Sequence, residues 1–220
     1  MKVGIVGFGV VGSAIREGFK FLGHEVFIHD IKLRTKLDSV LPTDICFLCV
    51  PTPANPDGSC NTDIVEEVVG QLDELGYTGV ICIKSTVTPG TTKKLQSEYP
   101  NSEICFVPEF LRERCAPEDF IHNHDICIIG ASSERTYKTV VAAHGTLPKN
   151  LIRVDETEAE LSKYFNNVYN ATLITFANSF YEICKKFDVN YTNVKSAIIN
   201  REHINDVYLD CRPDLRGFGG

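Results

Sequence analysis

The sequence predicts an α/β fold, with a doubly wound parallel sheet followed by a long helix and a small helical region. Three observations support this prediction. Short apolar runs recur along the first half of the chain and beyond, and helix-like segments separate most of them. A glycine-rich turn follows the first run, and roughly 30 residues without proline or glycine lie between positions 157 and 187. Alternating strands and helices build a parallel sheet, whereas a helix of that length exceeds what one small sheet can cover.

The apolar runs have the length and composition of buried strands. They lie at Lys2–Val6, Glu25–His29, Asp44–Val50, Val80–Lys84, Ile104–Val107 and Ile126–Ile129. Between them, Asp63 with Glu66 is typical of a helix N-cap and its reciprocal partner, and Gly90 starts a polar amphipathic segment that reaches Tyr99. Because ligands bind at the carboxyl ends of parallel strands, the residues that follow these runs are the candidates for function.

Three glycines, Gly7, Gly9 and Gly12, follow the first run, and Asp30 closes the second run 18 positions beyond Gly12. This is the complete fingerprint of a Rossmann-type dinucleotide-binding domain. The first glycine permits a tight turn, the second lets the backbone approach a pyrophosphate, and the third allows close packing of the helix. Asp30 would accept hydrogen bonds from the adenosine ribose and repel a 2′-phosphate, so we expect NAD in preference to NADP. The cofactor-binding residues of this segment are Gly7, Phe8, Gly9, Val10, Val11, Gly12 and Asp30.

Charge and composition exclude several classes of protein. The net charge of −7 and the isoelectric point near 5.4 leave no uniform basic surface for nucleic acid or for an anionic membrane. No stretch is long and apolar enough to span a bilayer, and the first apolar run breaks at Gly7 without a signal-peptide pattern. We therefore expect a cytoplasmic protein.

The nine cysteines are interpreted as reduced thiols, most of them in the core. Cys46 and Cys49 form a CxxC pair, but alternation along a strand directs them to opposite faces. His122 and His124 lack the thiols or carboxylates that would complete a zinc set, so we interpret them as part of a solvated loop. No metal site is expected.

After residue 150 the pattern changes. A short apolar strand, Leu151–Val154, precedes Thr157 and Glu160, which have the spacing of a capping box. The helix that they start should end near Phe187. A helix this long should carry an apolar stripe, which favours a homodimer formed through it.

Polar clusters follow three of the predicted strands. Val50-Pro51-Thr52-Pro53 ends the third strand, Ser85-Thr86-Val87-Thr88-Pro89-Gly90 the fourth, and Pro108-Glu109-Phe110-Leu111-Arg112-Glu113 the fifth. All three clusters therefore fall on the ligand-binding edge of the sheet. On the predicted long helix, the four-residue spacing of Lys163 and Asn167 places both on one face, next to Asn166.

These clusters resemble those of the UDP-glucose/GDP-mannose dehydrogenase family, and the runs STVTPGTT and PEFLRE are the most specific elements. The resemblance extends from Met1 to the last residue, because the tail Pro213–Gly220 is similar to the glycine-rich loop that precedes the family's reactive cysteine. Enzymes of this family oxidise the C6 alcohol of a nucleotide sugar to a carboxylate in two NAD-dependent steps. The resemblance implies a NAD-binding Rossmann domain over residues 1–150 and a central helical region over residues 151–220 with the dimer interface. The family's second, C-terminal nucleotide-binding domain is expected to be absent from this sequence.

The resemblance also implies roles on the cofactor side of the site. Thr86 and Glu113 would hold a catalytic water near the nicotinamide. Thr52, with Val50 and Pro51, would contact the cofactor.

On the substrate side, the resemblance implies that Lys163 and Asn167 stabilise negative charge on the substrate oxygen. An ammonium and an amide donor suit that role where water is excluded. The residues expected to line a UDP-sugar, largely through backbone groups, are Glu109, Phe110, Leu111 and Arg112.

Two features depart from the family pattern. The sequence stops at Gly220, before the family's cysteine, and neither Cys184 nor Cys211 can replace it from its position in the sequence. We therefore expect these 220 residues not to complete the second oxidation, and we expect a fragment or a compact relative. The segment between Asp30 and Asp44 is shorter than in most relatives, which leaves the identity of the sugar open.

Other interpretations remain open. A β-hydroxyacid or 6-phosphogluconate-type dehydrogenase also joins a Rossmann domain to a helix with a lysine and an asparagine, although STVTPG and PEFLRE argue against it. The chain could instead be a non-catalytic NAD-binding dimerisation module. At single positions, Lys163 and Asn167 could form a solvated helix face, and Glu109, Arg112 and Glu113 a surface ion-pair cluster.

Overall fold

The computed structural model describes residues 1–214 and 216–217. The chain forms two compact units, Met1–Lys163 and Tyr164–Gly220. The boundary between them falls inside a long helix, α6 (Glu156–Lys186). The first unit holds the glycine-rich turn, the three strand-end clusters and Lys163.

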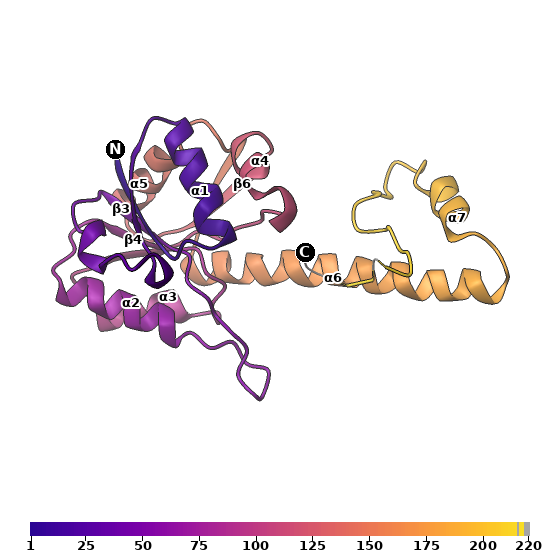
Figure 1. Cartoon of the computed structure of the whole chain (residues 1–220), viewed down its shortest axis with the longest axis horizontal. Coiled ribbons are helices and arrows are strands. Elements are labelled where there is room, and N and C mark those ends of the chain that lie inside the picture. Colours follow the sequence, from indigo (N-terminus) through magenta and orange to yellow (C-terminus); the bar gives the residue numbers. More distant parts are fainter. Residues whose placement is uncertain (215, 218–220) are drawn as a thin grey trace. The chain divides into compact units, whose positions relative to one another are not determined.

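A seven-stranded sheet runs through the first unit (Figure 1). Its strands are β1 (Lys2–Val6), β2 (Glu25–His29), β3 (Ile45–Leu48), β4 (Val80–Ile83), β5 (Glu103–Phe106), β6 (Ile126–Gly130) and β7 (Asn150–Val154). Their order, β2-β1-β3-β4-β5-β6-β7, confirms the predicted α/β fold. One pair departs from the predicted parallel arrangement, because β5 and β6 are antiparallel where Phe106 meets Gly130. An apolar run has the same pattern in either direction, so the sequence does not encode this reversal.

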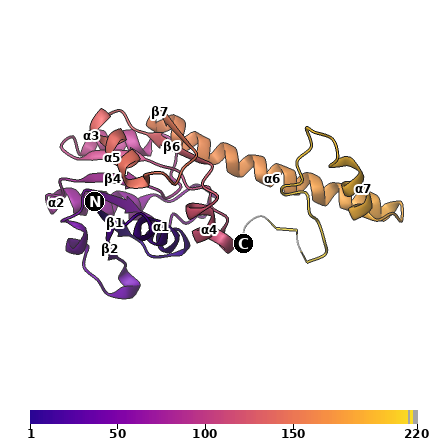
Figure 2. The same ribbon diagram turned by 90° about the horizontal axis from the view of Figure 1, so that it is seen from above.

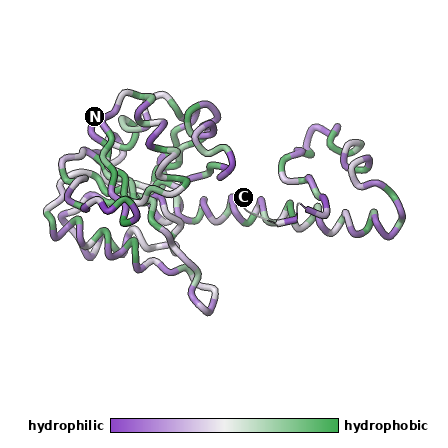
Figure 3. The backbone as a smooth tube through the Cα atoms, in the orientation of Figure 1, coloured by the Kyte–Doolittle hydropathy of each residue, from purple (hydrophilic) through white to green (hydrophobic). Residues whose placement is uncertain are grey.

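Helices cover both faces of the sheet (Figure 1). One face carries α1 (Val10–Phe21), α4 (Ala116–Ile121) and α5 (Glu134–His144), and the other carries α2 (Asp63–Glu74), α3 (Thr91–Glu98) and the start of α6. Figure 2 shows α4 beside α1, where a Cβ on Gly18 would lie 2.1 Å from the ring of Phe120. The hydrophobic residues concentrate along the central strands of this unit (Figure 3).

The two faces of the sheet have separate apolar cores. The first core contains Val3, Ile5, Ile15, Phe19, Phe47 and Phe120, and the second contains Leu48, Val65, Leu72, Ile81, Ile83 and Leu95. As predicted, Cys46 and Cys49 lie on opposite faces, in the second and first core respectively. Burial raises the pKa of both thiols, so both stay protonated. All nine cysteines are free.

The segment between β2 and β3 consists of two short 3₁₀ turns, η1 (Ile31–Leu33) and η2 (Leu37–Val40). Leu37 and Val40 are buried in the core beneath α2. No further strand follows β2 on that side, so β2 forms the edge of the described sheet.

The predicted cap of α2 is shifted by one residue. The N-cap is Thr62 rather than Asp63, and the Thr62 hydroxyl donates to the Glu66 carboxylate at 2.7 Å. The side chain of Asn61 accepts a hydrogen bond from the backbone N–H of Asp63 at 3.0 Å. Asn61 therefore supplies the acceptor that the prediction assigned to Asp63.

The predicted capping box of α6 is also wrong in its residues. The Asp155 carboxylate accepts from the N–H of Thr157 at 3.0 Å, and the Glu158 carboxylate accepts from the N–H of Asp155 at 2.9 Å. The box is therefore Asp155 with Glu158, at the same spacing as the predicted Thr157 and Glu160. Glu160 is instead buried and binds another helix.

The predicted long helix is confirmed as α6, most of which lies in the second unit. The second unit also contains α7 (Tyr191–Ile198). Ala177 and Cys184 of α6 pack against Tyr191 and Cys211. Of the helices in the described chain, none has the length and apolar character needed to cross a membrane.

Candidate functional site

The glycine-rich turn joins β1 to α1, and each glycine there has its own steric reason. Gly7 has a φ of +92°, and a Cβ on it would lie 2.5 Å from the carbonyl oxygen of Cys49. A Cβ on Gly12 would lie 2.0 Å from the carbonyl oxygen of Gly7. At Gly9 the Cβ position meets no described atom within 4 Å outside its immediate chain surroundings. The turn therefore leaves open space at the N-terminus of α1, where a phosphate can approach the backbone.

Asp30 lies against this turn. Its carboxylate accepts from the N–H of Phe8 at 2.6 Å and from the N–H of Lys32 at 2.7 Å. The Phe8 hydrogen bond is the main reason that the pKa of Asp30 is lowered, so the carboxylate is ionised at neutral pH. Val10 is exposed at the first turn of α1, whereas Val11 packs against the core.

The loop after β3 lies next to the glycine-rich turn. Because β1 is flanked by β2 and β3, the loops after β1 and β3 border the point at which the strand order reverses, where doubly wound sheets bind ligands. Ser85 Oγ donates to the carbonyl oxygen of Val50 at 2.6 Å. Beyond Val50, Pro51 is exposed and Thr52 is half-buried.

Thr86 follows β4 and is half-buried, and its carbonyl oxygen accepts from the Cys60 thiol at 3.5 Å. The same cluster is tied to α6 by Glu160, which is 0% exposed. The Glu160 carboxylate accepts from the N–H of Gly90 at 2.5 Å and from the N–H and hydroxyl of Thr92 at 2.8 and 2.6 Å. Glu160 thus caps α3, which has no cap from its own N-cap residue.

The PEFLRE cluster brings one buried glutamate, Glu109, into contact with two lysines. Glu109 is buried and its carboxylate lies 3.0 Å from the ammonium of Lys84. Lys163 Nζ donates to the main-chain carbonyl of Glu109 and lies 5.5 Å from the ring centroid of Phe110. Burial lowers the pKa of Lys163, Glu109 opposes the shift and the positive charge of Lys84 adds to it. The cluster therefore places a half-buried ammonium beside backbone groups of the predicted sugar-lining segment.

The rest of the cluster faces α4 and solvent. Arg112 makes a paired contact with Asp119, from Nε at 2.9 Å and from Nη2 at 2.6 Å. These bonds from Arg112 lower the pKa of Asp119 to about 2. Leu111 packs against the core, whereas Glu113 is exposed at the start of a 3₁₀ turn, η3 (Glu113–Cys115). Among the contacts of the described residues, none joins Glu113 to Thr86, so the water that they are predicted to share stays a prediction.

Asn167 lies four residues beyond Lys163 on α6, inside the second unit, and is half-buried next to Asn166. Its spacing from Lys163 is that of neighbours on one side of a helix. The joint action of the two residues on a substrate oxygen remains a prediction.

Three residues of the site were not singled out correctly from the sequence. Lys84 was assigned to a strand, although a charged residue that ends a buried apolar run signals a buried pair. Asp119 carried no signal, because its partner lies in the preceding loop. Glu160 was assigned to the wrong cap.

The histidine loop differs from its prediction. His122 is exposed as expected, but His124 is buried, with its ring 4.9 Å from that of Phe120 and 6.0 Å from that of His144. The prediction of a solvated loop is therefore wrong at His124, because α4 and α5 enclose its ring. In the part of the chain that the structure describes, no group of three or more metal-ligating side chains is found.

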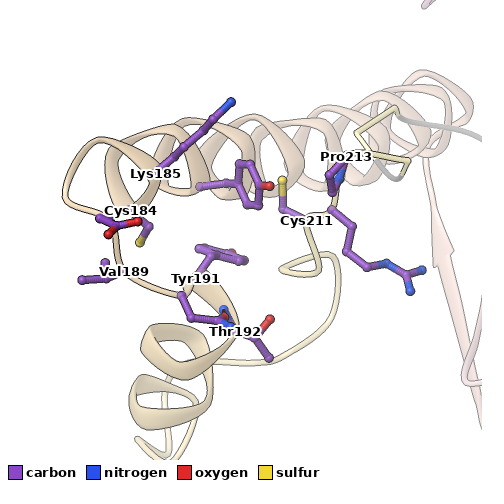
Figure 4. Close-up of a pocket in the computed structure, with 11 residues that line it drawn as sticks. Cys184, Lys185, Val189, Tyr191, Thr192, Cys211 and Pro213 are labelled. Atoms are coloured by element: carbon purple, nitrogen blue, oxygen red, sulfur yellow. Dashed lines mark hydrogen bonds between the residues drawn. The ribbon is translucent and has the colours of Figure 1, made fainter.

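A cavity of about 490 Å³ lies in the second unit (Figure 4). Cys184 of α6, Tyr191 of α7 and Cys211 line it. Burial raises the pKa of the Cys211 thiol, which donates to the side-chain oxygen of Asn178 at 3.1 Å. None of the predicted site residues lines this cavity.

Comparison with known proteins identifies two matching family domains. Residues 29–147 match the NAD binding domain of the UDP-glucose/GDP-mannose dehydrogenase family. Residues 157–220 match the central domain of the same family.

Individual relatives agree with this match. The chain is 28% identical to the UDP-glucose 6-dehydrogenase of Haloferax volcanii, covering 100% of this chain and 62% of that protein. It is 27% identical to the GDP-mannose 6-dehydrogenase of Azotobacter vinelandii, covering 100% of this chain and 61% of that protein. Among solved structures, a UDP-glucose dehydrogenase from Pyrobaculum islandicum superposes with a TM-score of 0.86 at 26% identity, covering 94% of this chain and 58% of that chain.

The chain spans about three fifths of the length of these relatives. The alignment with the Haloferax volcanii protein extends over 271 positions, against 220 residues here. This chain therefore lacks residues that the relative has within the matched region.

Proposed function

Because this chain belongs to the UDP-glucose/GDP-mannose dehydrogenase family, we propose that the protein oxidises the C6 hydroxyl of a UDP-sugar with NAD as the oxidant. The contact between Lys163 and the PEFLRE cluster carries this proposal. Lys163 donates to the Glu109 carbonyl and lies over the ring of Phe110. A lysine of the long helix thereby reaches the segment that we assign to the sugar, in the same compact unit as the glycine-rich turn.

The residues around the turn fit NAD. Gly9 leaves room for the pyrophosphate, and the ionised Asp30 has lone pairs for the ribose hydroxyls beyond those that accept from Phe8 and Lys32. Val50, Pro51 and Thr52 would complete the crevice on the β3 side. Bound there, NAD would supply the hydride acceptor for the oxidation of C6.

The chain's own residues would manage the charge of the substrate oxygen. When the C6 hydroxyl gives its proton to water, negative charge develops on the C6 oxygen, and the ammonium of Lys163 would stabilise that charge. Asn167 would donate to the same oxygen. Thr86 and Glu113 would hold a catalytic water near the nicotinamide.

We also propose that the protein is a homodimer formed through α6. In the second unit this helix and Phe187, the residue that follows it, expose a stripe of large apolar side chains, of which Phe165 is 77% and Phe187 75% exposed. The stripe consists of Phe165, Val168, Tyr169, Phe176, Phe180, Ile183 and Phe187. Their spacing follows the period of a helix that packs one side against a partner.

The test is NADH formation with UDP-glucose, GDP-mannose and a 3-hydroxy acid as alternative substrates. We expect NADH from the first oxidation of UDP-glucose, and a kcat that is lower by about 100-fold or more in Lys163→Met. The matched control is Lys149→Met, which removes the same charge from an exposed position. Oxidation of the hydroxy acid alone would overturn the proposal in favour of a β-hydroxyacid dehydrogenase. Binding of NAD without turnover of any substrate would favour a non-catalytic module.

A further inference from the structure

Lys84 and Glu109 form a buried ion pair that the proposed chemistry does not use. Their side chains are only 1% and 9% exposed, and the Lys84 ammonium lies 3.0 Å from Glu109 Oε2. Lys84 directly follows β4 and Glu109 lies two residues beyond the buried Val107. The pair therefore links the ends of two neighbouring strands beneath the proposed site.

The pair settles which ammonium the Glu109 carboxylate neutralises. Oε2 faces Lys84, and Oε1 accepts from the N–H of Phe110 at 2.9 Å. Lys163 reaches the same residue but binds its main-chain carbonyl. Two ammonium groups therefore lie near Glu109. Lys84 is the one that pairs with the carboxylate and balances its negative charge.

We propose that Lys84 is a positioning residue of the site: it binds the Glu109 carboxylate, so that Lys163 meets only the neutral carbonyl of Glu109 and keeps its positive charge for a substrate oxygen. The role of Lys163 toward a substrate oxygen rests on the proposed function. The pairing of Lys84 with Glu109 does not depend on NAD or on a sugar. A buried carboxylate without Lys84 would turn to the nearest remaining cation, which is Lys163. The ammonium would then be neutralised before any substrate arrives.

The surroundings support this assignment. Burial alone would lower the pKa of Lys84, but the Glu109 carboxylate raises it above its usual value, so Lys84 stays charged. The other titratable groups near Lys84 include the thiols of Cys49, Cys82 and Cys127 and the ring of His144, and His124 lies near both members of the pair. Burial raises the pKa of the three thiols and lowers the pKa of the two histidines, so these groups are neutral at pH 7. Lys84 is therefore the cation that balances Glu109.

The test is a direct titration of Lys163 in the full chain without cofactor or sugar. The ¹³Cε resonance of Lys163, assigned by its loss in Lys163→Arg, reports its protonation as the pH is raised. In Lys84→Met we expect the pKa of Lys163 to rise by about one unit or more, because the freed carboxylate pairs with it. In Lys84→Met/Glu109→Gln the pKa should fall back, because that carboxylate is gone. Lys149→Met, a charge-matched control at an exposed position, should leave it unchanged.

A folded Lys84→Met protein, checked by circular dichroism, with an unchanged or lower pKa of Lys163 would overturn the proposal. Should that variant fail to fold, Glu109→Gln decides: losing the carboxylate beside Lys84 should lower the pKa of Lys163 by about one unit, and no change would overturn the proposal. The titration gives its answer even if no sugar is turned over. Conversely, turnover could be lost in Lys163→Met although Lys84→Met does not raise the pKa of Lys163. That combination would leave the proposed function intact and would refute only the role of Lys84.

Discussion

The Nδ1 atom of His144 lies 2.9 Å from the carbonyl oxygen of Val140 and donates to it, because a carbonyl can only accept. The ring is fully buried, with the rings of Phe19 and Phe47 at 5.7 and 5.6 Å. Its Nε2 atom has no hydrogen-bond partner among the described residues. Burial lowers the pKa of His144 to about 3, and the positive charge of Lys84 adds to the shift.

This histidine predicts a loss of stability in acid. In the unfolded chain it takes up a proton below about pH 6.5, whereas the folded protein resists protonation until about pH 3. Between these values the unfolded state binds more protons, so stability falls as the pH falls, by up to about 1.4 kcal/mol per pH unit from this residue. In urea unfolding between pH 7 and 4, His144→Leu should show a shallower loss than the wild type. His203→Leu, at an exposed position, should keep the wild-type slope, and equal slopes for all three proteins would contradict the prediction.

The glycine-rich turn predicts different results for two similar substitutions. Gly12→Ala places a Cβ 2.0 Å from the Gly7 carbonyl oxygen, so α1 must move and the folded state should lose about 1–3 kcal/mol. Gly9→Ala meets no such obstacle and should fold normally, but its methyl group fills the space proposed for the pyrophosphate. Thermal unfolding should reveal the lower stability of Gly12→Ala. Titration with NADH should show that Gly9→Ala binds the cofactor with an affinity that is weaker by about tenfold or more. If Gly9→Ala bound NADH as tightly as the wild type, the proposed pyrophosphate site at this turn would be refuted.

The fold could be predicted from the sequence because its signals are local. The apolar runs, the three glycines and the segment without proline or glycine fix the strands, the turn and α6 without reference to distant residues. The direction of β6 could not be predicted, since it depends on the path through α4. The caps of α2 and α6 were misplaced because several polar residues near each helix start have suitable spacings.

The candidate site could be predicted only in part. The strand-end clusters can be recognised from their residue composition, but the contacts that they make depend on residues far apart in the sequence. Lys84 and Glu109 are 25 positions apart, and Glu160 reaches Gly90 across 70 positions. The burial of His124 likewise follows from packing against His144, which no local pattern reveals. Sequence motifs therefore indicated where chemistry could occur, and the tertiary structure determined which charges meet there.

Asp30 predicts the choice between NAD and NADP. Its carboxylate, held against the turn by the N–H of Phe8, is ionised and would repel a 2′-phosphate. We expect calorimetry to show tighter binding of NAD than of NADP by the wild type. Asp30→Ala should weaken NAD binding about tenfold, since a charged hydrogen bond contributes about 1.5–3 kcal/mol, and should narrow the difference between the cofactors. Equal affinities in the wild type would refute this role for Asp30 without affecting the assignment of the glycines.

The apolar stripe on α6 predicts a dimer that one charge can break. Phe176 is 55% exposed and its ring lies 5.6 Å from that of Phe180, so the two rings form a pair at the middle of the stripe. Phe176→Glu would bury a carboxylate in the proposed interface and should weaken the dimer about 30-fold or more in sedimentation equilibrium.

Lys185→Glu is the control, because nine residues separate it from Phe176, which places it half a turn away on the opposite side of α6. It introduces the same carboxylate at an exposed position and should sediment like the wild type. If the wild type remained monomeric at every concentration, or if Phe176→Glu associated as strongly as Lys185→Glu, then α6 would not be the interface. Loss of the dimer in Phe176→Glu alone, with the helical content of all three proteins unchanged by circular dichroism, assigns the association to the stripe.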